Sequence, residues 1–248
     1  MELQPPNRLP ITGERTVPDV AEENYWFRRH EACYRWALDY VSDYRARAVL
    51  DAGTGEGFGA AMAAARGHLV TAVELDDAAA THAHLRYPDL DVVRANLVAL
   101  PLRSHAFDAC LSLQVIEHIW DVPAYLAELL RCTVGPVILS TPNRPVHSPG
   151  LAPGARPDNL FHVREYDIAE LEDLLRPHLQ ATARRAAYFG LRHGPVIAGW
   201  EKRNGSLPAR LANGPAPDFA EAVRERDFVI EPFTRVRAGE YLDLVSVL

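Results

Sequence analysis

The chain has 248 residues and a net charge of −7, and 48 % of its residues are hydrophobic while 24 % are charged. These values are ordinary for a globular protein and leave room for one α/β domain with insertions or for two small domains. The negative charge argues against a nucleic-acid partner held by bulk electrostatics. No apolar run is long enough to span a membrane, and residues 1–6 lack a signal-peptide pattern. Because the three cysteines also lack metal-ligand spacing, we expect a cytoplasmic protein.

The first segment of the chain changes from an arm to a helix near residue 21. Residues 1–20 are rich in proline and polar side chains, which predicts an extended arm. Residues 22–44 place apolar side chains such as Tyr25, Cys33 and Trp36 at helical spacing, which predicts an amphipathic helix. We therefore expect residues 1–45 to form an N-terminal arm and a lid or cap helix.

Short apolar strands alternate with helices over residues 48–141. The predicted strands cover residues 48–51, 69–75, 91–95, 109–113 and 136–141. The predicted helices cover residues 60–66, 77–86 and 123–132. This alternation implies βαβ units and a mostly parallel sheet.

The alternation ends after residue 141. Residues 142–163 form a long loop rich in proline, asparagine, histidine and glycine, and so long a loop is usually functional or disordered. We then expect a helix at 167–175, a strand at 181–189, an insertion at about 190–226 and a closing strand at 241–248. Residues 46–248 would thus form one domain with insertions at about 142–163 and 190–226.

A glycine-rich turn after the first predicted strand indicates a nucleotide site. Glycines let the backbone approach a ligand, and the helix that follows offers free N–H groups. Gly55, Gly57 and Ala60 also fit the dinucleotide pattern G-x-G-x-x-G/A, so the spacing alone is ambiguous. Asp51 before the turn suits an ammonium group, and Glu74 at the end of the second strand can accept hydrogen bonds from ribose hydroxyls. Together they favour S-adenosylmethionine (SAM), although either could instead cap a turn or be solvated.

Residues 49–57, which read VLDAGTGEG, resemble the first motif of the class I SAM-dependent methyltransferases. Glu74 resembles the acid after their second strand, and residues 95–101 resemble their adenine-binding segment, with Asn96 in place of the common Asp. The resemblance implies an α/β Rossmann-like fold with a seven-stranded, mostly parallel sheet, an antiparallel last strand, helices on both faces and loop insertions. With Arg29 as a partner for the SAM carboxylate, the expected cofactor site consists of Asp51, Gly53, Gly55, Gly57, Glu74, Leu75, Asn96, Leu97, Gln114 and Arg29.

A second polar cluster follows the fourth predicted strand. Glu117 and His118 resemble the Glu-His pair of small-molecule O-methyltransferases, some of which carry E-x-x-E-H and use a divalent metal. Gln114 stands where that pattern has its first Glu, and its amide oxygen can still bind a hard cation. We expect Mg²⁺, or else Mn²⁺ or Zn²⁺, at Glu117, His118 and Gln114. The alternative is that Glu117 caps a helix and His118 is packed.

Three histidines are candidates for the catalytic site, namely His118, His147 and His162. Histidine is the commonest general base at neutral pH, so His147 or His162 could take the proton of an acceptor hydroxyl. Either could instead be a loop residue with backbone partners. Arg164 and Glu165 could brace the loop or touch the substrate.

Residues 9–31 resemble the start of actinobacterial O-methyltransferases that act on polymethylated polysaccharides, such as the mycobacterial methylmannose polysaccharide 1-O-methyltransferases. This resemblance implies an oligosaccharide acceptor, for example a mannoside in polysaccharide biosynthesis. Tyr25, Trp26 and Phe27 could stack on a sugar, close over SAM or simply pack the helix. The oligomeric state stays open, with a homodimer as one option.

Other functions remain to be weighed against sugar O-methylation. The acceptor could be a quinol or a carboxylate, or the chain could be a non-catalytic SAM-binding subunit. An NAD-dependent reductase shares the βαβ start but needs a Tyr-x-x-x-Lys pair. The chain has one lysine, Lys202, and residue 198 is alanine, which argues against a reductase.

Overall fold

The computed structural model describes residues 15–213 and 219–248, so most of the expected arm at 1–20 lies outside the described residues. The chain divides into two compact units. The described part of unit 1 consists of residues 15–18, Ala37–Ser112 and Asp121–Ile138. Unit 2 consists of Asp19–Trp36, Leu113–Trp120 and the described residues from Leu139 to Leu248. The expected boundary at residue 45 stays a prediction.

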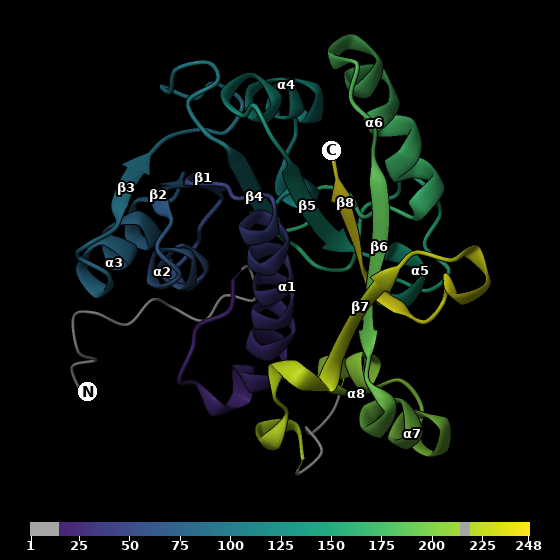
Figure 1. The fold of residues 1–248 in the computed structure, drawn as a ribbon. Coiled ribbons are helices and arrows are strands. Elements are labelled where there is room, and N and C mark those ends of the chain that lie inside the picture. The colour runs from purple at the N-terminus through teal and green to yellow at the C-terminus, as the bar shows by residue number, and fades with distance from the viewer. Residues whose placement is uncertain (1–14, 214–218) are drawn as a thin grey trace. The chain divides into compact units, whose positions relative to one another are not determined.

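Unit 1 contains the alternating strands and helices that the sequence predicts (Figure 1). Its strands are β1 (Ala48–Ala52), β2 (Leu69–Glu74), β3 (Asp91–Arg94) and β4 (Ala109–Leu113, whose last residue belongs to unit 2). Its helices are α2 (Phe58–Ala65), α3 (Asp77–Arg86) and α4 (Val122–Cys132). The strands follow the order β3-β2-β1-β4, next to the beginning of β5 (Val137–Pro142), and the pairs β1–β2, β1–β4 and β2–β3 are all parallel. The expected parallel sheet is confirmed.

The core of unit 1 explains why its central strands are almost wholly apolar. A parallel sheet buried on both faces favours continuous hydrophobic runs over alternation. All five residues of β4 are buried, and Leu50 and Leu111 are completely shielded from solvent. Leu126 of α4 is likewise inaccessible. The glycine-rich turn begins where β1 leaves this core, directly after Ala52.

Unit 2 combines the first part of a long helix with an antiparallel group of strands. Helix α1 (Asn24–Asp43) confirms the predicted helix over 22–44, and its residues Asn24–Trp36 belong to this unit. The strands are the end of β5, then β8 (Tyr241–Val247), β6 (Ala187–His193) and β7 (Phe228–Pro232). Strand β6 pairs antiparallel with both β7 and β8. The other helices are α5 (Arg144–His147), α6 (Ile168–Thr182), α7 (Pro195–Asn204) and α8 (Leu207–Asn213).

Five short 3₁₀ helices complete the described elements, and one of them carries candidate site residues. They are η1 (Ala21–Glu23), η2 (Ile116–His118), η3 (Ala220–Ala222), η4 (Glu225–Asp227) and η5 (Arg235–Arg237). In the described parts of the chain, no helix combines the length and apolar character needed to cross a membrane.

The structure corrects several details of the sequence prediction. The described sheet has eight strands instead of seven, because β7 adds an edge strand beside β6. Helix α6 runs through Pro177 to Thr182, so strand β6 begins at Ala187 and not at residue 181. The expected insertions contain regular structure, namely α5 within 142–163 and α7 and α8 within 190–226. The closing strand at the C-terminus is confirmed, and it is antiparallel to β6.

Candidate functional site

In unit 1 the turn after β1 has a backbone that only glycine adopts easily. Gly55 has a φ of +60° and Gly57 a φ of +95°, both in the left-handed region that other residues rarely occupy. A Cβ atom on Gly57 would lie 2.9 Å from the Cβ of Ala83 in α3. The turn therefore needs glycine for its conformation and for its close contact with α3. Helix α2 begins directly after Gly57, so its first N–H groups face the end of the turn.

Two carboxylates flank this turn, as the sequence predicts. Asp51 is completely buried, and its Oδ2 accepts a hydrogen bond of 2.6 Å from the hydroxyl of Thr54. Glu74 at the end of β2 accepts hydrogen bonds at Oε2 from the backbone N–H of Gly55 (2.8 Å) and at Oε1 from that of Leu75 (2.8 Å). Glu74 is thus held in place by the turn and is not merely solvated. The backbone N–H of Asp76 also donates to Oε1 at 3.0 Å, so of about four lone-pair positions Glu74 keeps one to accept a hydrogen bond from a ligand.

The other predicted cofactor residues of unit 1 follow strands β2 and β3. They therefore lie at the same edge as the turn after β1, where the carboxyl ends of these parallel strands meet. Leu75 is 58 % exposed, an unusual position for a large apolar side chain at the end of a buried strand. Asn96 is exposed, and its side-chain oxygen accepts a hydrogen bond of 3.2 Å from the N–H of Val98. Leu97 is buried. Leu75 therefore offers an apolar face, and the Asn96 side-chain oxygen keeps a second lone pair for a donor such as the adenine amino group.

In unit 2 Arg29 lies at the centre of a buried polar network. Its Nε donates to Oδ2 of Asp243 at 2.8 Å, and its Nη2 donates to Oδ1 of the same carboxylate. Nη2 is also 3.1 Å from Nε2 of His147 and 3.5 Å from Oε1 of Gln114. The expected role of Arg29 and Gln114 in SAM binding stays a prediction. Because Asp243 already neutralises the guanidinium, Arg29 would act on a ligand as part of this network.

Two partly buried histidines near this network have lowered pKa values. His147 is the last residue of α5, which follows β5, and its Nε2 is 3.0 Å from the carbonyl oxygen of Leu242. Burial, reinforced by the positive charge of Arg29, holds the pKa of His147 well below its usual value. The same two causes lower the pKa of His30 to about 3. A neutral imidazole is the form that can accept a proton, which keeps His147 a candidate base, but a pKa this low makes it a weak one.

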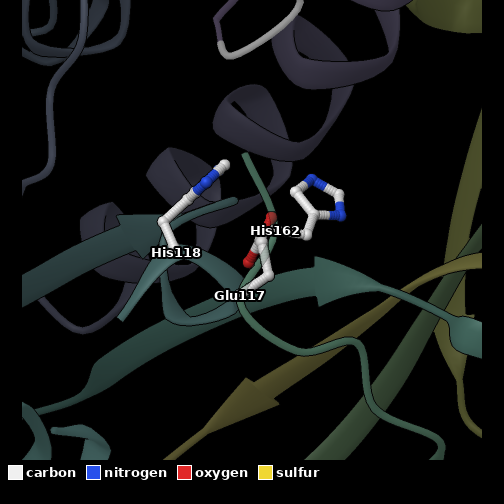
Figure 2. A group of neighbouring side chains, drawn as sticks. All are labelled: Glu117, His118 and His162. Carbon is white, nitrogen blue, oxygen red and sulfur yellow. The ribbon is translucent and has the colours of Figure 1, made fainter. Parts of the chain in front are cut away.

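Glu117, His118 and His162 form a compact group in unit 2. One potential ligand atom from each lies within 4.8 Å of the other two, and Figure 2 shows the Glu117 carboxylate between the two imidazole rings. The ring centroids of His118 and His162 are 5.1 Å apart. Glu117 and His118 lie on η2. Backbone hydrogen bonds from Val163 and Arg164 to the carbonyl oxygen of Glu117 hold the segment that carries His162 against η2. These contacts explain why residues 45 positions apart in the chain meet.

The donor set of this group fits a divalent cation. Glu117 is 1 % exposed, and its Oε2 is buried with no hydrogen-bond partner in residues 15–213 and 219–248. Burial raises the pKa of Glu117, while His118 and His162 lower it. An unpaired buried carboxylate oxygen is costly, and a cation would satisfy it. Two imidazoles with one carboxylate suit Mn²⁺ or Zn²⁺ better than Mg²⁺, which prefers oxygen ligands.

Gln114 has other contacts in the described structure. It has a φ of +58° directly after β4. Its side-chain Nε2 donates to the hydroxyl of Ser140 at 3.1 Å, and its Oε1 faces Arg29. Both ends of the amide are therefore engaged within the network of Arg29. The predicted metal role of Gln114 stays untested, and His162 supplies the third ligand that the geometry offers.

The aromatic residues at the start of α1 are mainly packed. Tyr25 is 2 % exposed and donates or accepts a 2.8 Å hydrogen bond with Nε2 of His193, while Phe27 is 9 % exposed. Trp26 is partly exposed, and its ring centroid is 6.5 Å from that of His147. Of the three, Trp26 keeps surface for contact with a ligand.

Several site residues were not singled out from the sequence. His30 and Asp243 lie close to Arg29, and Asn159 contacts His162 of the second group. A signal for Asp243 existed, since it is the one acid in the apolar segment Tyr241–Leu248. His30 and Asn159 lie in polar surroundings along the sequence, so no local pattern marks them, and both are partly buried in the structure.

Comparisons with known proteins agree with this geometry. The family model of a methyltransferase domain matches residues 50–135. A probable S-adenosylmethionine-dependent methyltransferase of Mycolicibacterium smegmatis is 38 % identical, and the alignment covers 98 % of this chain and 95 % of that protein. A probable S-adenosylmethionine-dependent methyltransferase of Mycobacterium tuberculosis is 42 % identical over 81 % of this chain and 70 % of that protein. The chain belongs to the SAM-dependent methyltransferases.

Solved structures give the same fold for this methyltransferase. The methyltransferase domain of bacterial CtHen1 has a TM-score of 0.60 and 16 % identity, covering 88 % of this chain and 98 % of that one. A SAM-dependent methyltransferase of Thermotoga maritima, described as a possible histamine N-methyltransferase, has a TM-score of 0.56 and 19 % identity, covering 90 % and 91 %. At these identities the likeness shows the Rossmann-like methyltransferase fold alone.

Proposed function

We propose that this methyltransferase transfers the methyl group of SAM to a hydroxyl group of a sugar or oligosaccharide, for example a mannoside, with the assistance of a divalent cation. The observation that carries the proposal is the group of Glu117, His118 and His162, because two imidazoles and a buried carboxylate can hold a cation beside an oxygen nucleophile. The full-length likeness to mycobacterial methyltransferases supports the transfer reaction. The resemblance of residues 9–31 to polysaccharide O-methyltransferases supports the acceptor.

Residues of unit 1 would bind the methyl donor. The backbone of Gly53, Gly55 and Gly57 would approach its methionine part, and Asp51 would accept a hydrogen bond from the α-ammonium group. Glu74 would accept a hydrogen bond from the ribose hydroxyls. Leu75 and Leu97 would contact the adenine ring, and Asn96 would accept a hydrogen bond from its amino group. Positioning of this kind is the main contribution of the protein, since the sulfonium already makes the methyl group electrophilic.

The residues of unit 2 would handle the acceptor. Glu117, His118 and His162 would hold the cation, which when bound lowers the pKa of a nearby hydroxyl group. In the transfer, the acceptor oxygen bonds to the methyl carbon while the carbon–sulfur bond breaks, giving a methyl ether and S-adenosylhomocysteine. The hydroxyl proton must leave, and a neutral histidine can take it. His147 and His162 are the two candidates for this role.

A transfer assay tests the proposed acceptor. Purified protein would be incubated with SAM labelled in its methyl group and, separately, with mannosides, quinols and small carboxylic acids, with Mn²⁺ present. We expect label in the mannoside as an alkali-stable ether. Transfer to a quinol or a carboxylate alone would replace the sugar acceptor with one of the alternatives. Binding of SAM with no transfer to any acceptor would favour a non-catalytic subunit.

A further inference from the structure

Glu165 has no role in the scheme above, yet it is one of the few completely enclosed carboxylates of unit 2. It is 2 % exposed, and its Oε1 lies 2.7 Å from Nδ1 of His162. Its Oε2 is buried without a hydrogen-bond partner among the described residues. Since the carboxylate can only accept, Nδ1 of His162 must carry the hydrogen of this contact.

A second set of hydrogen bonds fixes the other side of the same ring. The backbone N–H of Phe161 donates to Oδ1 of Asn159 at 3.0 Å, which leaves the Asn159 amide nitrogen as the donor toward Nε2 of His162, also at 3.0 Å. Nε2 of His162 is therefore an acceptor and carries a lone pair. The chain of contacts runs from Phe161 through Asn159 and His162 to Glu165, and it permits one neutral tautomer of the histidine.

This tautomer matters because only a nitrogen with a lone pair can bind a cation. Nδ1 is occupied by Glu165, so Nε2 is the ring nitrogen that His162 can offer beside Glu117 and His118. A histidine ligand that donates its other N–H to a carboxylate is both oriented and made more basic. His118 has a parallel arrangement, since its Nδ1 is 2.9 Å from the carbonyl oxygen of Phe161. Each of the two imidazoles is thus oriented by an oxygen atom that contacts its Nδ1.

We propose that Glu165 is the positioning residue that holds His162 with its Nε2 lone pair available for the cation bound by Glu117, His118 and His162. The inference rests on the cation of the proposed function. It also separates the two candidate bases: His162 is committed to the cation, and His147 is left to take the proton. Asn159 yields its contact with Nε2 when the cation binds.

The chain offers a matched control for Glu165. In the same unit Oε2 of Glu201 lies 2.7 Å from Nδ1 of His193, the same distance as in the Glu165–His162 pair. His193 contacts Tyr25 through its Nε2 and is not part of the Glu117 group. Glu201→Gln therefore makes the same chemical change to a Glu–His pair that faces no candidate ligand.

The test titrates Mn²⁺ into the full-length protein and measures its affinity by calorimetry. In Glu165→Gln a neutral amide replaces the carboxylate, so His162 loses the charged acceptor that makes its Nε2 more basic, while Asn159 still donates to Nε2. We expect Mn²⁺ to bind Glu165→Gln about 10- to 100-fold more weakly than the wild type, and Glu201→Gln to bind within about twofold of wild type by the same principle. SAM affinity, measured in parallel, should be unchanged in both variants and reports that they fold.

A second measurement observes the tautomer directly and needs no cation. Long-range ¹⁵N–¹H spectra of the histidine rings distinguish a protonated Nδ1 from a protonated Nε2, and the signal absent from His162→Gln assigns the ring. We expect protonated Nδ1 in the wild type and a mixture when Glu165→Gln is combined with Asn159→Ala, because both contacts that select the tautomer are then changed. Unchanged Mn²⁺ affinity in Glu165→Gln, together with an unchanged tautomer in the double variant, would overturn the role of Glu165. Absence of Mn²⁺ binding by the wild type would instead overturn the cation itself, and this inference with it.

Discussion

Asp243 of β8 accepts hydrogen bonds from two nitrogen atoms of Arg29 of α1, and the two side chains are 1 % and 4 % exposed. Both charges are removed from water, so each depends on the other for its stabilisation. The same guanidinium contacts His147 and Gln114. One buried ion pair therefore connects the first turns of α1 with the closing strand and with a candidate base.

Asp243→Ala should destabilise the protein by about 3–5 kcal/mol, because it leaves the Arg29 charge buried and unpaired. The free energy of unfolding would be measured by denaturant titration. Glu172→Gln is the control, since it breaks the exposed ion pair with Arg235 and should cost less than about 1 kcal/mol. A loss in Asp243→Ala no larger than in the control would show that the buried pair contributes little.

Glu74→Ala should weaken SAM binding by about 10- to 100-fold, the equivalent of roughly 1–3 kcal/mol of lost hydrogen bonding. The variant loses the ribose acceptor and also the contact that holds the N–H of Gly55. Calorimetry with SAM measures the change. Asp39→Ala, which removes an exposed carboxylate paired with Arg66, is the control and should bind SAM normally. Equal SAM affinity in Glu74→Ala would remove Glu74 from the site.

Local patterns were sufficient to predict the fold of unit 1. The apolar strands, the glycines at 55 and 57 and the acid at 74 each reflect a requirement that acts over a few residues, such as burial on both faces or a left-handed backbone. Strand β7 was not predicted, because Phe228–Pro232 is short and carries an acid and a proline. Its stability comes from pairing with β6, which is a contact between distant residues. Helix α6 passes through Pro177 because its capping box and buried Leu171 and Leu175 stabilise it.

The candidate site was partly predictable for the same reason. Glu117 and His118 are adjacent and match a motif, so the sequence identified them. The third member, His162, was noticed only as a candidate base, since nothing in the sequence indicates that its segment lies against η2. The partner of Arg29 could not be assigned either, because Asp243 lies 214 positions away in the chain. Long-range pairing of this kind depends on the tertiary structure.

Removal of the cation should abolish most of the activity. After exhaustive chelation we expect turnover to fall strongly and to return with Mn²⁺, because the hydroxyl is a weak nucleophile without it. Glu117→Ala should lose both Mn²⁺ affinity and turnover. Gln114→Ala should retain Mn²⁺ affinity, since the Gln114 amide contacts Ser140 and Arg29. Full activity after chelation, together with full activity of Glu117→Ala, would reject a catalytic cation.

His30 should make the stability depend on pH below neutrality. Its pKa is about 3 in the folded protein against an ordinary 6.5, so between these values the unfolded chain binds a proton that the folded chain does not. Stability should therefore fall as the pH decreases below 6.5, by up to about 1.4 kcal/mol per pH unit from this group. Denaturant unfolding at pH 7, 6 and 5 measures it. His30→Gln should flatten the profile, and an equally steep profile in that variant would assign the effect elsewhere.

The two candidate bases should separate when turnover, Mn²⁺ affinity and SAM affinity are measured on the same variants. His147→Ala should lower turnover by about 10²–10⁴, the usual contribution of a general base, while SAM and Mn²⁺ still bind. His162→Ala should lose Mn²⁺ affinity as well as turnover, because it removes a ligand. His178→Ala, on α6 and outside both groups, is the control and should behave as the wild type. Because the pKa of His147 lies well below its usual value, protonation of this residue should lower the rate only at a pH well below the one at which an ordinary histidine titrates. If His147→Ala keeps full turnover while His162→Ala loses turnover but retains Mn²⁺ affinity, then His162 is the base and the assignment of the two histidines must be reversed.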